Sequence, residues 1–298
     1  MGAHSGEVHA ASFSADGEHL VSGGEDGTIR LWNCRSGKEL AAWENRLPRY
    51  YRSYPVYAVA FSPSGRAVIS GGNDYAIKVW DGRSGEIVKA FGQHYNVVSL
   101  GSSANGQRLV SGSRDCMNAD ASVKLWDVAS GAEIRTFDGD YSDINAVALS
   151  PDGSLVAAGS DDAAARIWSA KRWSLRRTKV LGCRAVVQSV AFSPDGRLLA
   201  TGDNAWQVRI WNVATGAERP MSGRHDDSVR SVCFSGDGQS VASAGWDSTV
   251  RVWNVSSGEQ RRVFRAKASL LTVTFSPDSR QVWAVDEAST PHVYRFDL

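Results

Sequence analysis

Histidine, serine and aspartate recur together in this chain, the combination that many hydrolases use for acyl transfer. Two sets have the same spacing, and each ends in a tryptophan: His4, Ser22, Asp26 and Trp32, and His225, Ser243, Asp247 and Trp253. In a hydrolase the histidine would accept the serine proton while the aspartate orients the imidazole. The set is repeated, and no nucleophile-elbow sequence surrounds either serine. We therefore expect these residues to have a structural role. We expect no catalytic residue in this chain, and we expect that the protein is not an enzyme.

Two other stretches resemble ligand sites only in part. The segment "DGDYSD", with Asp138, Asp140 and Asp143, resembles the start of a calcium loop but lacks the closing glutamate. The glycines of "SGGEDG" at 22–27 are not accompanied by the lysine of a phosphate-binding loop. The four cysteines are scattered without a CxxC pair, which argues against a zinc site or a disulfide framework. We expect no metal and no cofactor.

A regular repeat must position these side chains. Tryptophans recur at intervals of roughly 41 to 48 residues, a period typical of repeat architectures. The series consists of Trp32, Trp80, Trp126, Trp168, Trp211 and Trp253, with Tyr294 taken as its seventh member. Turn sequences such as "SPDG" at 150–153 and 193–196 recur in step with it. The sequence therefore predicts seven copies of one structural unit.

Each unit predicts four short strands. In the sixth, "VRSVCFS" alternates apolar and polar residues, "SVASAG" is small and apolar, "VRVWNV" alternates again, and "QRRVFRA" is more polar. Glycine- and serine-containing turns separate them. Such a unit cannot bury its own faces, so the sheets must pack radially on one another. The predicted fold class is all-β, with seven blades of four antiparallel strands and the polar fourth strand outside.

The Trp-Asp dipeptides in "VWD" at 79–81 and "LWD" at 125–127, with the "SPDG" turns and the repeat period, resemble the WD40-repeat family. The resemblance covers essentially the whole chain and implies a seven-bladed β-propeller that serves as a rigid binding platform without catalysis. We expect one domain over residues 1–298. Its repeats are expected at about 4–44, 45–92, 93–138, 139–181, 182–223, 224–265 and 266–298.

The resemblance also implies that the His-Ser-Asp sets hydrogen-bond to one another and to the buried tryptophan of their blade. This network is incomplete elsewhere in the sequence. The second unit has no obvious histidine, Ala158 replaces the serine in the fourth, and Ala205 replaces the aspartate in the fifth. We therefore expect blades 4, 5 and 7 to be less stable than the others.

The final segment, "HVYRFDL" at 292–298, predicts the third strand of the seventh blade. No fourth strand follows it, and only three residues precede the first repeat. An open alternating edge favours strand pairing, which natural proteins usually prevent. We expect that a longer native chain completes the blade, with donation of a strand by a partner as the alternative. The remaining possibility is that the propeller tolerates a last blade of three strands.

Composition limits the classes of partner. The formal net charge is +1, which weighs against nucleic acid as a partner. The basic stretch "KRWSLRRTKVLGCR" at 171–184 is interpreted as a charged outer strand, with a nucleic-acid or anionic-lipid contact as the alternative. No apolar run is long enough to span a membrane, and the N-terminal residues lack the pattern of a signal peptide. We expect a cytoplasmic protein without a membrane partner.

A binding surface is predicted on one face of the propeller, the top face. Two longer loops, at 44–55 and 114–122, would open there. Family resemblance places residues that flank the first strands, and residues before the turn aspartates, on the same face. The candidate partner-binding residues are Tyr57, Arg230, Trp246, Trp206, Gln188, His9, Tyr51 and Tyr54. Asn145 and Leu271 occupy further positions of this kind. Aromatic residues and arginine dominate binding hot spots, although Trp206 and Trp246 could instead pack on neighbouring loops.

The predicted function is a scaffold that binds a protein or peptide on the top face, with an unknown partner. The chain most resembles WD40 domains of larger multidomain signalling proteins, in which it would act as a sensor or tether. A propeller that binds a small ligand or glycan, with Trp206, Trp246 and the tyrosines stacking on it, is the alternative. An enzyme with a site in the central channel would need converging titratable groups that the sequence does not show.

Overall fold

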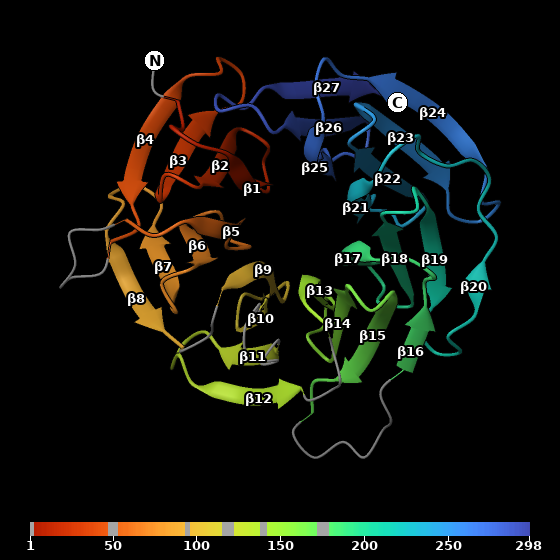
Figure 1. Ribbon diagram of the computed structural model, residues 1–298, viewed down its shortest axis with the longest axis horizontal. Helices are drawn as coiled ribbons and strands as arrows, with labels where there is room; N and C mark the ends of the chain where they lie inside the picture. The colour runs from red at the N-terminus through yellow and green to blue at the C-terminus, as the bar shows by residue number, and fades with distance from the viewer. Residues whose placement is uncertain (1–2, 47–52, 93–95, 115–121, 138–141, 172–178) are drawn as a thin grey trace.

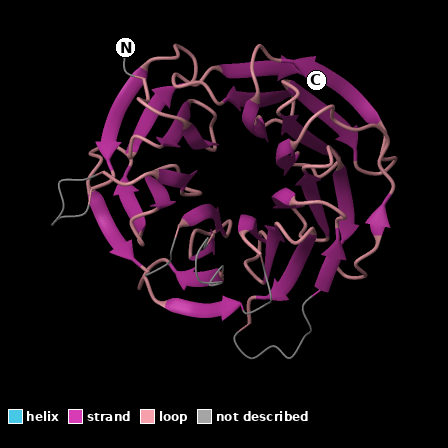
Figure 2. Cartoon of the chain, viewed as in Figure 1, coloured by secondary structure: helices cyan, strands magenta, loops and turns pink. Residues whose placement is uncertain are grey.

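Strands alternate with short turns along the entire chain in the computed structural model, which describes residues 3–46, 53–92, 96–114, 122–137, 142–171 and 179–298. These residues form strands and loops only (Figure 2). Nothing in this part of the chain forms a helix long and apolar enough to cross a membrane. The strands are grouped into seven sheets, which we number as blades 1 to 7 in chain order.

The strand bounds show the repeat directly. Blade 1 contains β1 (Val8–Phe13), β2 (His19–Gly24), β3 (Thr28–Asn33) and β4 (Glu39–Glu44), and blade 2 contains β5 (Val56–Phe61), β6 (Ala67–Gly72), β7 (Ile77–Asp81) and β8 (Ile87–Phe91). Blade 3 contains β9 (Val97–Ser102), β10 (Arg108–Ser113), β11 (Val123–Asp127) and β12 (Glu133–Phe137), and blade 4 contains β13 (Ile144–Leu149), β14 (Leu155–Ser160), β15 (Ala164–Ser169) and β16 (Lys179–Gly182). Blade 5 contains β17 (Val187–Phe192), β18 (Leu198–Asp203), β19 (Val208–Asn212) and β20 (Glu218–Arg219), and blade 6 contains β21 (Val229–Phe234), β22 (Ser240–Gly245), β23 (Thr249–Asn254) and β24 (Gln260–Arg265). Blade 7 contains β25 (Leu270–Phe275), β26 (Gln281–Asp286) and β27 (Val293–Asp297).

The blades form a closed ring (Figure 1). In each blade, consecutive strands pair antiparallel from the centre outwards, and the first strands surround the middle of the ring. The all-β propeller predicted from the sequence is therefore confirmed. Blade 7 has three strands among the described residues, and β27 is its outermost strand. The question of what would complete that edge stays a prediction.

The recurrent "SPDG" sequence folds into the same turn in successive blades. In blade 4, the Ser150 hydroxyl donates to Asp152 Oδ1 at 2.6 Å and accepts from the Leu155 amide at 2.9 Å. Gly153 completes the turn with a φ of +66°, a conformation that costs glycine little. Side-chain and backbone hydrogen bonds thus fix the connection between the first and second strands.

The core lies between neighbouring blades. One cluster joins Val21 and Ile29 of blade 1 to Val56 and Val68 of blade 2 and to the buried tryptophan of that blade, Trp80. Each blade has an equivalent layer against the next, because one sheet cannot bury both of its faces alone. This radial packing holds the first strands in fixed positions around the channel.

Strand register corrects one sequence assignment. The tryptophan of each third strand faces a fixed position of the second strand; for example, Trp253 pairs with Val241. In blade 7 the residue at that position is Phe296, which pairs with Val282, whereas Tyr294 pairs with Ala284. Tyr294 was therefore the wrong seventh member of the series. The connection from β26 to β27 is longer than the one from β22 to β23 in blade 6. The tryptophan position of blade 7 therefore comes two residues later in the sequence than the spacing in blade 6 would place it.

Candidate functional site

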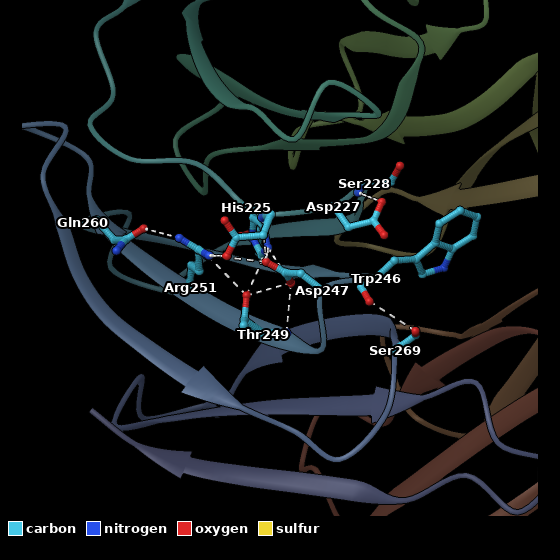
Figure 3. Close-up of polar contacts among 11 residues, drawn as sticks. His225, Asp227, Ser228, Trp246, Asp247, Thr249, Arg251, Gln260 and Ser269 are labelled. Carbon is cyan, nitrogen blue, oxygen red and sulfur yellow. Dashed lines mark hydrogen bonds and ion pairs between the residues drawn. The ribbon is translucent and has the colours of Figure 1, made fainter.

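His225 and Asp247 of blade 6 lie in one connected network with Thr249 and Arg251 (Figure 3), and Ser243 joins it through His225. His225 Nδ1 lies 3.0 Å from Asp247 Oδ1, and its Nε2 lies 2.5 Å from the Ser243 hydroxyl. The Thr249 hydroxyl donates to Asp247 Oδ1 at 2.7 Å, and Arg251 Nη2 donates to Asp226 Oδ2 at 2.8 Å. The network ties the turn between β22 and β23 to the loop that leads into β21.

Blade 1 repeats this arrangement. His4 Nδ1 lies 3.0 Å from Asp26 Oδ1, and its Nε2 lies 2.8 Å from the Ser22 hydroxyl. The Trp32 indole donates to the same hydroxyl at 2.8 Å. Ser22 has no exposed surface, as is also true of Ser243 in blade 6. A nucleophile must reach its substrate, so this burial favours a structural role for both sets over acyl transfer.

The tryptophan of blade 6 departs from the expected network. Its indole, Trp253 Nε1, donates to the backbone carbonyl of Ser222 at 2.7 Å and not to Ser243. Trp253 itself is fully buried. A buried indole needs one acceptor, and a nearby carbonyl serves as well as a hydroxyl.

Other carboxylates replace those missing from the repeat. In blade 5, Asp203 lies two positions before Ala205 and accepts from the Ala205 and Gln207 amides at 3.0 Å each. Asp286 takes this position in blade 7, where it accepts from the His292 amide at 3.0 Å and from the Tyr294 hydroxyl at 3.1 Å. Sequence reasoning missed both, because the carboxylate comes from the strand end and not from the turn. The lower stability expected for these blades remains a prediction.

Blade 2 replaces the missing histidine with a lysine. Lys78 Nζ lies 2.7 Å from Asp74 Oδ2 and donates to Asn45 Oδ1 at 2.5 Å. Both members of this ion pair are almost fully buried. A charged pair thus connects the turn of blade 2 to the preceding loop at Asn45.

Acidification is expected to weaken the blade 1 network in two steps. Burial lowers the pKa of His4 below its ordinary value of 6.5, although Asp26 opposes the shift. The unfolded chain then binds a proton that folded His4 does not, so this contribution is complete above pH 6.5 and declines below it. Burial alone would raise the pKa of Asp26, but hydrogen bonds from His4, Ser5 and Thr28 hold it at about 2. Its contribution is present above pH 3.8 and is lost as the pH falls towards 2.

Urea unfolding at a series of pH values measures both steps. The substitution His4→Gln should flatten the dependence just below pH 6.5, because the titrating imidazole is gone. Equal slopes for the wild-type and variant proteins between pH 7 and pH 5 would contradict the role of His4.

Part of the predicted top-face set meets at the central channel. A cavity of about 360 Å³ lies there and is lined by first-strand residues from all seven blades. Six of the residues singled out from the sequence line it: His9, Tyr57, Asn145, Gln188, Arg230 and Leu271. Each of the six follows the buried apolar residue at the start of its first strand, so strand alternation turns it to the opposite side, towards the channel.

The cavity residues contact one another in pairs. The rings of His9 and Tyr57 meet edge to face with centroids 5.1 Å apart, and His9 Nε2 lies 2.8 Å from Glu25 Oε2. Across the opening, Arg230 Nη1 donates to Gln188 Oε1 at 2.9 Å. The lining is thus polar and partly ordered by its own contacts.

Trp246 lies beside this opening. Its indole points away from the buried network of blade 6 (Figure 3), it is 44% exposed, and the Arg230 guanidinium lies 5.2 Å from its ring centroid. Trp246 thus packs partly on Arg230 and keeps a large part of its surface exposed.

The remaining candidates do not line the channel cavity. Trp206 occupies the turn between β18 and β19 with a φ of +71° and stacks on Arg224 at 5.3 Å. Tyr54 lies on the loop into blade 2, where its carbonyl accepts from Asn45 Nδ2 at 3.2 Å. Tyr51 lies outside the described residues, as do most of the two longer loops and of the "DGDYSD" segment. Among the residues that are described, no cluster of three or more histidine, cysteine or acidic side chains could hold a metal ion.

Sequence reasoning overlooked Arg114 as a lining residue. It follows β10 directly, as Trp246 follows β22, so the repeat itself carried the signal. Arg114 lines the channel cavity and donates from Nη2 to Asn145 Oδ1. The cavity therefore contains two arginines, one from blade 3 and one from blade 6.

Comparison with known proteins agrees with the propeller. The chain has 49% identity over 45 residues to the serine-threonine kinase receptor-associated protein of Homo sapiens, which is 15% of this chain and 13% of that protein. It has 48% identity over 40 residues to WD repeat-containing protein 38 of Homo sapiens, 13% of each chain. It also has 49% identity over 37 residues to the ribosome biogenesis protein ERB1 of Yarrowia lipolytica, 12% of this chain and 4% of that protein. The matches thus span only a small part of each relative's length.

The family comparison covers far more of the chain. The model described as WD domain, G-beta repeat, matches residues 1–33, 47–81, 85–127, 131–169, 175–212 and 221–254. These six stretches correspond to blades 1 to 6, and blade 7 repeats their geometry with Phe296 at the tryptophan position. The chain belongs to the WD40 family of β-propellers.

Proposed function

We propose that this propeller is a non-catalytic interaction scaffold that binds a protein or peptide over the channel opening of its top face. The observation that carries the proposal is the meeting of lining residues from all seven blades beside the exposed indole of Trp246. Side chains held on first strands of a closed ring are rigid, and rigid surfaces lose little entropy on binding. Tryptophan, tyrosine and arginine are the residues most enriched in binding hot spots.

The small-ligand alternative has less support. Stacking on a glycan would need aromatic faces that are free and close together. Trp206 and Trp246 instead each face an arginine, and neither indole lines the channel cavity. The arrangement is better suited to an extended partner.

We also propose that the protein is located in the cytoplasm, which is a reducing compartment. Cys34, Cys183 and Cys233 are free thiols. Burial raises the pKa of Cys34 and Cys183 to about 11 and that of Cys233 to about 12. Such thiols are unreactive and serve as small apolar residues, as is usual where disulfides are not used.

Affinity capture with two matched double variants tests the platform. Tyr57→Ala with Trp246→Ala removes two aromatic side chains beside the opening and should reduce retention of a partner at least tenfold, because hot-spot truncations are large. Leu40→Ala with Val88→Ala removes exposed apolar side chains from the outer strands and should leave retention unchanged. Circular dichroism checks that both variants are folded. Equal retention by the two variants would overturn the top-face assignment.

A further inference from the structure

Two arginine side chains in the channel cavity form no ion pair within the part of the chain that the structure describes. They are Arg114 and Arg230. Each instead donates to a neutral amide of a neighbouring blade, Arg114 to Asn145 and Arg230 to Gln188. An amide oxygen orients a guanidinium but does not neutralise it.

Within the described ranges, most of the hydrogen-bonding capacity of these guanidiniums is unused. A guanidinium carries five N–H protons, and each of these two donates one hydrogen bond to the described residues. The Nε atoms of both are buried without a partner in that part of the chain. A buried donor left unpaired is costly, and an anion bound to the outer N–H groups of each guanidinium would offset part of that cost by charge.

The two charges also oppose each other. Burial lowers the pKa of Arg230 from its ordinary value, and the positive charge of Arg114 adds to this effect. The carboxylate of Glu287 acts in the opposite direction. A charge held against desolvation and repulsion is stabilised by an incoming anion.

We propose that the channel mouth is a carboxylate-binding site, in which Arg114 and Arg230 together hold an aspartate or glutamate side chain of an acidic peptide. The proposal rests on the proposed function and names the chemistry of its partner. Guanidinium forks match carboxylates in a planar, two-hydrogen-bond geometry. Trp246 and Gln188 fix the Arg230 guanidinium from two sides, so little entropy remains to be lost.

Nearby acids favour a singly charged ligand over a phosphate. Asn145, which accepts from Arg114, also donates to Asp161 Oδ1 at 2.6 Å. Glu287 lies near enough to act on Arg230. These two carboxylates would repel a dianionic phosphate more strongly than a single carboxylate.

Nuclear magnetic resonance of the arginine Nε–H groups tests the site directly. The probes are N-acetyl-glutamate N-methylamide, its neutral glutamine counterpart and the phosphoserine counterpart. The glutamate probe should shift the Nε–H signals of Arg114 and Arg230 with a dissociation constant on the order of 1 mM, the range for so small a ligand. The variants Arg114→Gln and Arg230→Gln assign the two signals, and each should weaken binding at least tenfold. Arg230→Lys, which keeps the charge but loses the fork, should weaken it as well.

Arg224→Gln is the matched control. Arg224 also stacks on a tryptophan and carries the same charge, but it is exposed and lies outside the cavity. Binding should be unchanged in this variant, and thermal unfolding should show that every variant is folded. Equal shifts with the glutamine probe, or equal losses in Arg224→Gln, would overturn the site. Tighter binding of the phosphoserine probe would replace the carboxylate assignment with a phosphopeptide. Loss of partner capture in the Tyr57 and Trp246 double variant, together with no binding of the glutamate probe, would leave the platform intact and refute the carboxylate site alone.

Discussion

Replacing Lys78 with methionine is expected to lower the free energy of unfolding by about 3–5 kcal/mol, because it leaves a buried charge without its partner. The side chains of Lys78 and Asp74 are only 3% and 1% exposed, and their charged atoms lie 2.7 Å apart. Neither Asp74 oxygen accepts a hydrogen bond of good geometry from the described residues. The ammonium is therefore what stabilises the carboxylate, by charge alone. Urea unfolding followed by tryptophan fluorescence measures the loss.

Lys124→Met in blade 3 is the matched control. Lys124 and Lys78 face the network serine of their own blades, Ser111 and Ser70, and both lie about 6 Å from the ring of the blade tryptophan. The partner of Lys124 is Glu133, and both of those side chains are partly exposed. Exposed pairs contribute at most about 1 kcal/mol, so this variant should lose little.

The double variant Asp74→Asn with Lys78→Met distinguishes an unpaired buried charge from a loss of packing. Removing both charges should recover most of the stability lost by Lys78→Met, because the desolvation cost of the carboxylate disappears. If Lys78→Met and Lys124→Met lose the same stability, or if the double variant shows no recovery, the loss arises from packing and not from a stranded charge.

The ring could be predicted from the sequence because each blade repeats its own signals. The alternation in the first and third strands, the mostly small or apolar second strands and the turns related to "SPDG" recur from unit to unit, so local preferences and global fold point the same way. Phe296 was not identified because β27 contains two aromatic residues two positions apart. Both satisfy the alternation, and only the pairing of Phe296 with Val282 decides between them.

The compensating aspartates were beyond prediction because they break the repeat. Asp203 and Asp286 replace turn aspartates from a position two residues earlier, where blades 1 and 6 have Gly24 and Gly245. Lys78 occupies the repeat position of Arg30 and Arg251, but the repeat did not show that its ammonium would lie within 2.7 Å of Asp74 where the blade has no histidine. A repeat alignment compares equal positions, whereas a hydrogen-bond network requires only that a suitable group reach the same place in space.

The channel residues were predictable in position but not in their contacts. Family resemblance predicted Tyr57, Gln188 and Arg230 on the top face, and in the structure they line the channel cavity. The resemblance could not show that Arg114 and Arg230 share one cavity, since they lie far apart in the sequence and on separate blades. It also did not separate Trp246, which stacks on a channel arginine, from Trp206, which stacks on an outer one.

Closure of the ring depends on the contact between blades 7 and 1, and Gly17→Ala is expected to disrupt it. Gly17 has a φ of +69°, and a Cβ there would lie 1.8 Å from Cζ3 of Trp283. The substitution combines the cost of a left-handed alanine, about 1–2 kcal/mol, with overpacking of about 1–3 kcal/mol. Trp283 also packs on Phe13 with ring centroids 5.8 Å apart, and Arg295 donates to the Gly17 carbonyl at 3.4 Å. A displaced indole would thus loosen several contacts across the closing interface.

Gly37→Ala isolates the packing component of this effect. Gly37 has a similar φ of +66°, but no atom lies within 4 Å of a Cβ placed there. It should therefore lose only the conformational part, and unfolding in urea should separate the two variants by about 1–3 kcal/mol. Trp283→Leu makes room beside Gly17, so adding Gly17→Ala to that background should cost no more than Gly37→Ala does. Equal losses for Gly17→Ala and Gly37→Ala in the wild-type background would mean that the turn yields without strain. In that case the contact between Gly17 and Trp283 contributes little to the stability of the closing interface. Blades 7 and 1 would then be held together mainly by the packing of their apolar faces, where Val285 contacts Leu20 and Trp32.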